Sequence, residues 1–320
     1  MLDILEDKRP MVERLKKTSL MSTVCDAYLH SEDYRNLSSK SQREYDYTLR
    51  IAMATEILTG KTIGKTQIQH FTLRHATHAY DAWLHRGVSR ANKIASIMSI
   101  LMNWASYREL VYRNPMNGLK RVPNKQRTVM WTQEQVNTFL DTAFSQWKYR
   151  SIGLIVMMAY EWGQRIGDMR LLTWDKLDLE TQRMDLEQSK RGAEVHLPIS
   201  DQLKHVLVQQ KDYFGFQPYV APQVRPSDGA YKPYILDTLC IHINEIKREA
   251  GLPLELTAMD LRRTAITEMV EAGVDITQIK QVSGHKNINS LTPYIKHTFS
   301  GASSALAMRQ AHKDRDNDDT

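Results

Sequence analysis

The sequence contains few cysteines and no long hydrophobic run. Its two cysteines, Cys25 and Cys240, are far apart and form no C-x-x-C pattern, which argues against a disulfide framework and a cysteine zinc site. No apolar stretch approaches the roughly 18 residues that span a bilayer, and the first residues lack the apolar centre of a signal peptide. We therefore expect a cytoplasmic protein with no membrane partner.

Positive charge is in modest excess. The 43 lysines and arginines outnumber the 37 aspartates and glutamates, so the formal net charge is +6. Four of the acids, at positions 314, 316, 318 and 319, crowd into the end of the chain. The rest is more basic than the total suggests, which favours a polyanionic partner, although a basic surface that only confers solubility fits the charge equally well.

Residues 19–113 have helical periodicity throughout. Apolar residues recur at helical spacing, as at Val24 and Tyr28, and no alternation typical of strands occurs. We expect a compact bundle of four helices, in which Ser89 caps one helix. Residues 1–18, which precede the bundle, are too few for an independent domain.

Residues 114–130 are rich in Pro, Gly, Asn and basic residues, which is typical of an interdomain linker. A second domain, residues 131–299, begins with a capping box at Thr132 and Gln135 ahead of an apolar run. Its pattern then predicts a buried apolar helix, a β-hairpin and two further helices, at residues 151–160, 184–199, 237–250 and 261–272. A small-residue stretch and an acidic tail, residues 300–320, end the chain. Together these patterns predict a mainly α-helical protein with a small β-hairpin or sheet, the second domain being α+β.

Four separated stretches carry residues suited to phosphate chemistry. They are WGQRIGDMRLLTW with Arg165, QSKRG with Lys190, MDLRRT with Arg262, and SGHKNINSLTPY with His285 and Tyr294. Taken singly, each has an ordinary explanation, such as a buried or capping histidine or a solvated hairpin turn.

The last of these stretches predicts a short helix that begins near Leu291. Ser290 would cap this helix, and Pro293 is tolerated in the first turn, where a backbone N–H would have no partner. Tyr294 would then lie in the opening turns. A tyrosine near a helix start is more often a packed side chain, so the other stretches must decide its role.

In this order and spacing the four stretches resemble those of the tyrosine recombinases, the phage-integrase family. The family's arginine motif, its hairpin lysine, its box ending in Leu-Arg-x-Thr, and its Gly-His pair followed nine residues later by tyrosine are all matched. Each motif alone is weakly specific, whereas their joint occurrence is strongly so. The resemblance covers most of the chain, because residues 131–299 correspond to the family's catalytic domain and residues 19–113 to its helical core-binding domain.

The resemblance implies a site-specific DNA recombinase, specifically a phage-type integrase, that exchanges strands through a 3′-phosphotyrosyl intermediate without cofactor or metal. It also implies a homotetramer on two synapsed double-stranded DNA sites, accessory DNA-bending or directionality proteins, and a C-terminal segment that docks on another protomer. A C-terminal helix that packs on its own domain fits the sequence of this segment equally well. Two basic domains and a basic linker would close around the duplex as a clamp. A phage-encoded protein of this kind acts in the host cytoplasm or nucleoid.

The resemblance assigns roles that the chemistry supports. Arg165 and Arg262 would hold the non-bridging oxygens of the scissile phosphate, because a planar guanidinium binds two oxygens where a lysine offers one point charge. Tyr294 would attack in line and form the phosphotyrosine ester. His285 would bond a non-bridging oxygen, and Lys190 would protonate the leaving 5′-hydroxyl.

Two positions near the arginines would have supporting roles. Asp168 stands where the family keeps an acid that orients the first arginine. Met259 stands three residues before Arg262, where the family usually carries a histidine, and a thioether cannot accept or pass a proton usefully. Two other functions stay open: a type IB topoisomerase, which uses similar chemistry, and a DNA-binding relative that has lost catalysis.

Basic residues outside these motifs are candidates for contacts with DNA phosphates. Solvated helix faces fit the bundle residues equally well, and Arg263 fits either a surface position or a phosphate contact. The candidates are Lys40, Arg43, Arg86, Arg90 and Lys93 in the bundle, and Lys120, Arg121 and Lys125 in the linker.

Overall fold

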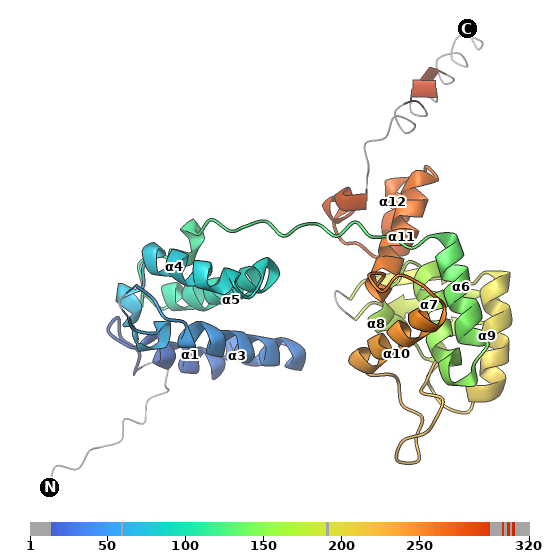
Figure 1. Ribbon diagram of the computed structural model, residues 1–320, viewed down its shortest axis with the longest axis horizontal. Coiled ribbons are helices and arrows are strands. Elements are labelled where there is room, and N and C mark those ends of the chain that lie inside the picture. The colour runs from blue at the N-terminus through green and yellow to red at the C-terminus, as the bar shows by residue number, and fades with distance from the viewer. Residues whose placement is uncertain are drawn as a thin grey trace. The chain divides into compact units, whose positions relative to one another are not determined.

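The chain forms two compact units, which divide between Arg127 and Thr128 (Figure 1). The computed structural model describes residues 14–58, 60–189 and 192–294, and positions 303, 306, 307, 309 and 310. The segments expected at 1–18 and 300–320 therefore fall mostly outside the described residues, as does Lys190 of the hairpin turn. No helix in the described part of the chain is long and apolar enough to span a membrane.

The first unit is a bundle of helices around one apolar core. Trp83 and Met98 are buried at its centre, and α5 packs against both α3 and α4. Buried alanines such as Ala79 and Ala95 allow the helices to approach closely. The helices are α1 (Met21–Leu29), α2 (Glu32–Arg35), α3 (Ser39–Ala54), α4 (Leu73–Leu84) and α5 (Val88–Tyr107). The four expected helices are present, and the single-turn α2 adds to them.

The start of α5 differs from the prediction. Gly87 occupies the N-cap position with a φ of 92°, and Ser89 lies inside the first helical turn. That φ is open to glycine and strained for other residues. The prediction of Ser89 as the cap is wrong, because the tight connection from α4 requires a left-handed residue where the cap would stand.

The first half of the expected linker is attached to the helical unit. Nδ2 of Asn114 donates to the carbonyl of Ser99 at 2.9 Å and to Oδ1 of Asn103 at 2.7 Å. Further along, the backbone N–H of Val122 donates to the Tyr80 hydroxyl at 2.9 Å. The stretch with no such bonds to the bundle is therefore shorter than its composition suggests.

The second unit surrounds α7 with helices and packs a small sheet against them. Residues Ser151 to Ala159 of α7 are all buried, as their apolar sequence predicts. Its helices are α6 (Gln133–Phe144), α7 (Arg150–Glu161), α8 (Ile166–Met169), α9 (Asp201–Phe214), α10 (Leu236–Glu249), α11 (Ala258–Glu271) and α12 (Ile276–Ser283). Its strands, β1 (Leu177–Asp178), β2 (Arg183–Glu187) and β3 (Glu194–Pro198), form an antiparallel sheet in that order, with Met184 opposite Leu197. The predicted fold class, mainly helical with a small sheet, is confirmed.

Two capping boxes set the starts of helices in the second unit. At α6 the backbone N–H of Gln135 donates to the Thr132 hydroxyl at 3.2 Å, and Oε1 of Gln135 accepts from the backbone of Thr132 at 2.9 Å, as predicted. Thr257 and Asp260 form the same arrangement at α11. This second box, which the sequence analysis missed, starts α11 three residues earlier than predicted.

Up to Tyr294, where the described residues end, the segment predicted to start a helix forms two short 3-10 turns. The turns are η7 (Ile288–Ser290) and η8 (Thr292–Tyr294). Asn287 caps them, since its side-chain oxygen accepts a backbone N–H two residues later at 2.9 Å, so the prediction of Ser290 as cap is wrong. Pro293 lies within the second turn, where a backbone N–H would have no helical partner, so the N–H that proline lacks costs no hydrogen bond. Positions 295–300 lie outside the described residues.

Candidate active site

Arg262 joins three segments of the second unit. Its guanidinium, on the buried side of α11, donates through Nη1 to the carbonyl of Gly163 at 3.1 Å and through Nη2 to the carbonyl of Ser283 at 2.6 Å. Gly163 follows α7 with a φ of 57°, a conformation that favours glycine. The side chain is therefore held by the backbone on both sides, and only 8% of Arg262 is exposed.

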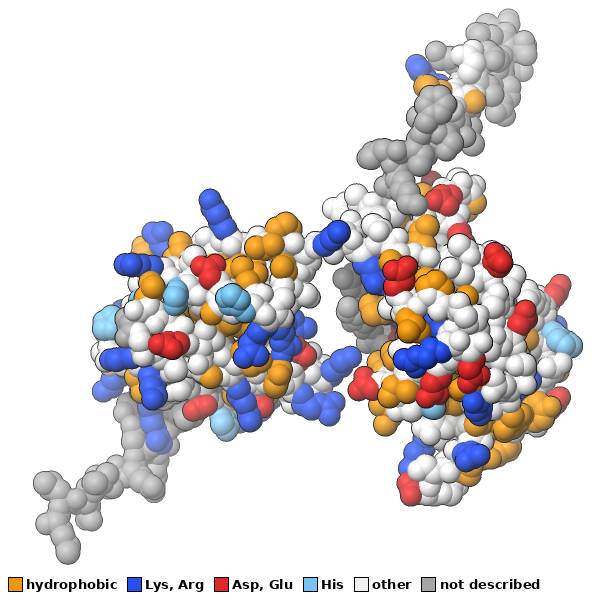
Figure 2. Space-filling model, viewed as in Figure 1, with side chains coloured by type: hydrophobic (Ala, Val, Ile, Leu, Met, Phe, Trp, Pro, Cys, Tyr) orange, Lys and Arg blue, Asp and Glu red, His pale blue; other side chains and the backbone are white. Residues whose placement is uncertain are grey.

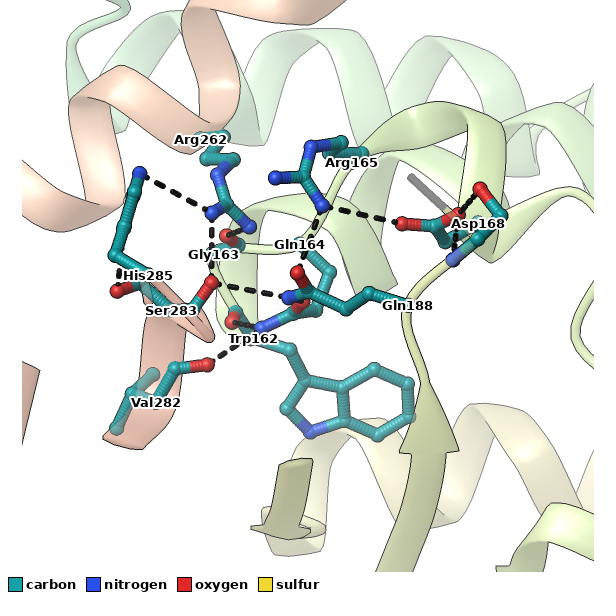
Figure 3. Close-up of polar contacts among 11 residues, drawn as sticks. Trp162, Gly163, Gln164, Arg165, Asp168, Gln188, Arg262, Val282, Ser283 and His285 are labelled. Atoms are coloured by element: carbon teal, nitrogen blue, oxygen red, sulfur yellow. Dashed lines mark hydrogen bonds and ion pairs between the residues drawn. The ribbon is translucent and has the colours of Figure 1, made fainter. Parts of the chain in front are cut away.

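Arg165 begins α8 and is bonded to the sheet. Its Nη1 donates to Oε1 of Gln188 at 2.7 Å and lies 3.7 Å from Oδ2 of Asp168. Figure 3 shows that Gln188 and the carbonyl of Ser283 connect the two arginines through a continuous set of hydrogen bonds. The structure therefore places two guanidinium groups, 97 positions apart in the sequence, in one network.

Asp168 is buried beside Arg165. Its Oδ1 accepts from the backbone N–H of Ser189 at 3.3 Å and from the Ser189 hydroxyl at a shorter distance. Its Oδ2 has no hydrogen-bond partner among the described residues. The carboxylate thus presents one oxygen toward the Arg165 guanidinium, which is the geometry that an orienting acid needs.

His285 lies beside Arg262 at the end of α12. Its Nδ1 is 2.7 Å from the Ser283 hydroxyl, and its Nε2 is 3.5 Å from Nη2 of Arg262. Gly284, between Ser283 and His285, has a φ of 65° and ends the helix in the left-handed conformation. The Gly-His pair therefore turns the imidazole back toward the arginine.

Tyr294 is half-buried next to this histidine. The centroids of the Tyr294 and His285 rings are 6.2 Å apart. The Tyr294 ring also packs on a small apolar cluster that contains Ile266, and the guanidinium of Arg263 lies 5.2 Å from its centroid. Arg263, which the sequence placed at the surface or on a phosphate, therefore contacts the candidate nucleophile.

Tyr160 and Tyr234, two further tyrosines of the second unit, are poorly suited to nucleophilic attack. The Tyr160 hydroxyl lies 2.7 Å from Oε1 of Gln133 and 3.0 Å from Oε1 of Glu268, and burial followed by the Glu268 charge raises the pKa of Tyr160. Burial raises the pKa of Tyr234 to about 12. A raised pKa disfavours the phenolate, so neither hydroxyl is prepared for attack.

Lys190 lies outside the described residues, but hydrogen bonds join the described residues before and after it. The backbone N–H of Gln188 donates to the carbonyl of Ala193 at 2.8 Å, and Gly192 donates back to Gln188 at 2.9 Å. The two residues that precede position 190 lie directly beside Arg165 and Asp168, because Gln188 and Ser189 bond those two side chains.

Met259 lies on α11 with 81% of its surface exposed. The adjacent Asp260 is buried, and its Oδ2 accepts from the backbone N–H and the hydroxyl of Thr257, each at 2.8 Å. The acid is therefore committed to starting the helix. No group next to Met259 in sequence replaces the expected histidine.

Thr264, the last residue of the Leu-Arg-x-Thr box, has a structural role. Its hydroxyl accepts from the backbone N–H of Trp131 at 2.9 Å and donates to the carbonyl of Asp260 at 3.0 Å. The threonine therefore fastens the start of the second unit to α11.

The bundle candidates for DNA contact lie on α3, on the start of α5 and at the connection between α4 and α5. Glu44 links α3 to α5, since it lies 3.1 Å from Arg90 and 3.7 Å from Lys93. The Arg90 guanidinium also lies 4.8 Å from the centroid of the Tyr47 ring. Arg86 lines a neighbouring cleft of about 650 Å³ with Tyr47. Lys40 and Arg43 are exposed on α3.

The linker candidates are divided. Lys120 and Lys125 are exposed. Arg121 instead bonds the bundle, donating to the Ser96 hydroxyl at 2.7 Å and to the carbonyl of Ala95 at 3.3 Å. Its guanidinium must give up these bonds before it can hold a phosphate.

The excess positive charge belongs to the first unit. Met1–Arg127 contains 21 lysines and arginines against 12 aspartates and glutamates, a net charge of +9, whereas Thr128–Thr320 contains 22 against 25, a net charge of −3. Figure 2 shows blue side chains spread over the visible face of the first unit, with few red ones among them. This distribution favours contact between the helical unit and a polyanion.

Comparison with known proteins decides the family. A model described as the phage integrase family matches residues 130–300, more than half of the chain. The chain belongs to this family, the tyrosine recombinases. It is 24% identical over 288 residues to tyrosine recombinase XerC of Pelobacter propionicus, covering 86% of this chain and 90% of that protein. It is 20% identical over 267 residues to the ICEBs1 integrase of Bacillus subtilis, covering 76% of this chain and 71% of that protein.

Solved integrase structures share the fold. A lambda integrase dimer bound to a COC′ core site is 18% identical with a TM-score of 0.70, over 90% of this chain and 81% of that one. A lambda integrase tetramer bound to a Holliday junction gives a TM-score of 0.71 at 16% identity over the same shares. Tn1549 transposon integrase in complex with transposon right end DNA gives 0.70 at 17% identity, over 90% of this chain and 99% of that one.

Two buried amides lie beside the arginines of this recombinase-family chain and were not predicted from the sequence. Gln188 and Gln164 are almost fully buried, and neither was considered beyond the motif letters in which it stands. A signal for Gln188 did exist. Strand alternation places it on the inward face with Met184 and Leu186, and a polar residue at such a position needs partners.

Proposed function

We propose that the chain is a site-specific DNA recombinase, a phage-type integrase, that cleaves and rejoins strands through a 3′-phosphotyrosyl intermediate. The observation that carries this proposal is the network joining Arg165, Arg262 and His285, with the Tyr294 ring 6.2 Å from the imidazole. Family membership supports the reaction class.

The two arginines would stabilise the transition state of phosphoryl transfer. Negative charge grows on the non-bridging oxygens as the tyrosine attacks, and guanidinium groups held in place beforehand need no reorganisation to meet it. Arg262 is held by two carbonyls, and Arg165 by Gln188 and Asp168. His285 would donate to one of the same oxygens.

The bond changes balance without a cofactor. The phenolic oxygen of Tyr294 bonds to phosphorus while the bond from phosphorus to the 5′-oxygen breaks. The phenol releases its proton to solvent, and Lys190 supplies one to the 5′-oxygen. Attack by the 5′-hydroxyl of a second strand reverses these steps and releases the tyrosine.

DNA binding would use both units. The helical unit would contact phosphates through Lys40, Arg43, Arg86, Arg90 and Lys93, joined by Lys120, Arg121 and Lys125 on the connecting segment, and the second unit would hold the scissile phosphate. The partner would be double-stranded DNA carrying recombination sites, bound by a homotetramer with accessory DNA-bending or directionality proteins. The DNA-bound integrases that share this fold, among them a tetramer on a Holliday junction, support this part of the proposal.

The test is a nicked suicide DNA that traps the covalent complex. Wild-type protein should form an adduct with its own recombination site, and Tyr294→Phe should form none while its DNA affinity stays unchanged. Only the nucleophilic oxygen is removed, so folding and binding have no reason to fail. An adduct that persists in Tyr294→Phe would exclude this residue as the nucleophile.

A second candidate function is DNA binding without catalysis. The exposed Met259, where the family usually has a histidine, favours it. If the wild type binds DNA specifically but forms no adduct on any suicide substrate, the chain is a DNA-binding protein without catalytic activity.

A further inference from the structure

Gln188 is a buried amide in the centre of the candidate site. It directly follows β2, and its side chain is 0% exposed. Glutamine is rarely buried without a full set of partners, because each unpaired amide atom costs free energy. The question is therefore what this side chain holds in place.

The hydrogen bonds of Gln188 fix its orientation. Its Nε2 donates to Oε1 of Gln164 at 2.6 Å and to the carbonyl of Ser283 at 3.0 Å, and its Oε1 accepts from Arg165 at 2.7 Å. Gln164 must present its Oε1 to Gln188, because its own Nε2 donates to the carbonyls of Trp162 at 2.9 Å and Val282 at 2.7 Å. The amide of Gln188 can point only one way, with its oxygen toward Arg165 (Figure 3).

The same side chain fills the space against the Gly-His turn. A Cβ added to Gly284 would lie only 2.6 Å from Nε2 of Gln188. The carbonyl of Ser283 that accepts from Gln188 also accepts from Arg262 at 2.6 Å. Gln188 therefore bonds Arg165 directly, shares the Ser283 carbonyl with Arg262, and packs against the turn that carries His285.

We propose that Gln188 is a positioning residue that fixes the distance between Arg165 and the Ser283 carbonyl. Because that carbonyl also holds Arg262, both guanidinium groups can then bind the same phosphate. The backbone N–H of Gln188 also donates to the carbonyl of Ala193 at 2.8 Å, so the same residue pairs with the returning segment of the hairpin. The inference rests on the proposed function and adds to it a residue that does not touch the DNA.

The test compares Gln188→Met with a matched control, Gln210→Met. Gln210 is also 0% exposed, donates to the Ser151 hydroxyl and the carbonyl of Val220, and accepts from Arg150 at 3.1 Å. Both variants lose a buried amide bonded to an arginine. We expect Gln188→Met to slow single-turnover cleavage by about 10²-fold, as misplacement of a catalytic group does, with DNA affinity unchanged. The folded Gln210→Met protein should cleave like wild type.

The isosteric variant Gln188→Glu adds a readout that general destabilisation does not move. Its carboxyl would face Arg165 directly, and Asp168, Arg262 and His285 are the other charged or titratable groups of the same network. When protonated it can replace the amide donor toward Gln164, whereas the ionised form faces acceptors and pairs with Arg165 in competition with phosphate. The ratio of variant to wild-type cleavage should fall as pH rises from about 5 to about 8. Gln210→Glu should show no such change in ratio.

The outcomes separate this inference from the proposed function. Absence of adduct from wild type overturns the proposed function itself. The role of Gln188 is then judged by ¹⁵N NMR of the Arg165 guanidinium, assigned with Arg165→Lys, in which restricted rotation about Cζ–Nη1 should be lost in Gln188→Met and kept in Gln210→Met. If wild type forms adduct while Gln188→Met cleaves as fast, or if the Arg165 signal is the same in both proteins, Gln188 is not a positioning residue.

Discussion

Neighbouring residues at the start of α11 differ in what they contact, and Met259 differs most from the others. Its neighbour Asp260 caps α11, and Arg263, one helical turn after Met259, contacts the Tyr294 ring. Met259 itself makes little contact with the folded chain, since 81% of its surface is exposed. A side chain so placed contributes little to stability, so its replacement tests chemistry alone.

We predict that Met259→His speeds single-turnover cleavage by up to about 10²-fold, because a histidine there adds general acid–base assistance. The stability of the variant should stay within about 0.5 kcal/mol of wild type. Met259→Leu, which has no titratable group, is the control and should cleave like wild type. A histidine variant that is slower than Met259→Leu contradicts the supporting role of this position.

At the scale of elements, the left-handed ends of helices decide where the residues of the candidate site point. Gly163 after α7 places its carbonyl on Arg262, and Gly284 after α12 turns His285 back to the same arginine. The space beside Gly284 is taken by the Gln188 side chain. The glycine of the Gly-His pair is therefore required both by its backbone conformation and by its neighbour.

We predict that Gly284→Ala lowers the free energy of unfolding more than Gly273→Ala does. Both glycines have positive φ, 65° and 75°, so both variants incur about 1–2 kcal/mol of backbone strain. Nothing lies within 4 Å of a Cβ at Gly273, whereas at Gly284 it would meet Gln188. Overpacking should add about 1–3 kcal/mol at position 284. Equal losses in denaturant unfolding would show that Gln188 moves aside at no cost.

At the scale of the whole molecule, charge and chemistry are divided between the units. The first unit has a net charge of +9 and the second −3, while the arginines of the candidate site belong to the second. Non-specific attraction to DNA should therefore come mainly from the helical unit. The second unit would then hold the scissile phosphate of the DNA and make few additional phosphate contacts.

We predict that log K for DNA binding falls steeply with log salt, by about 0.9 for each phosphate neutralised. Arg86→Ala and Lys93→Ala should each make the slope shallower by about 0.9, the contribution of one phosphate contact. Lys211→Ala, an exposed lysine of α9, is the control and should leave the slope as it is. If all three substitutions change the slope by the same amount, Arg86 and Lys93 are not specific phosphate contacts, and the DNA does not bind preferentially at this face of the first unit.

The sequence alone determined the local features of this protein. Periodicity located the helices, the Thr132 capping box set the start of α6, and apolar composition identified α7 as a buried helix. These follow from residues within a few positions of one another, so neighbours in the chain suffice. The order of the motifs also indicated the family, and the family model matches residues 130–300.

Only the tertiary structure decided which groups meet. Gln188 bonds a carbonyl 95 positions later, and Trp131 bonds the Thr264 hydroxyl 133 positions later. Local pattern carries no information about such partners, because they depend on how whole helices pack. The same holds where the prediction failed: Gly87, not Ser89, starts α5, since the turn between two packed helices required a left-handed residue there.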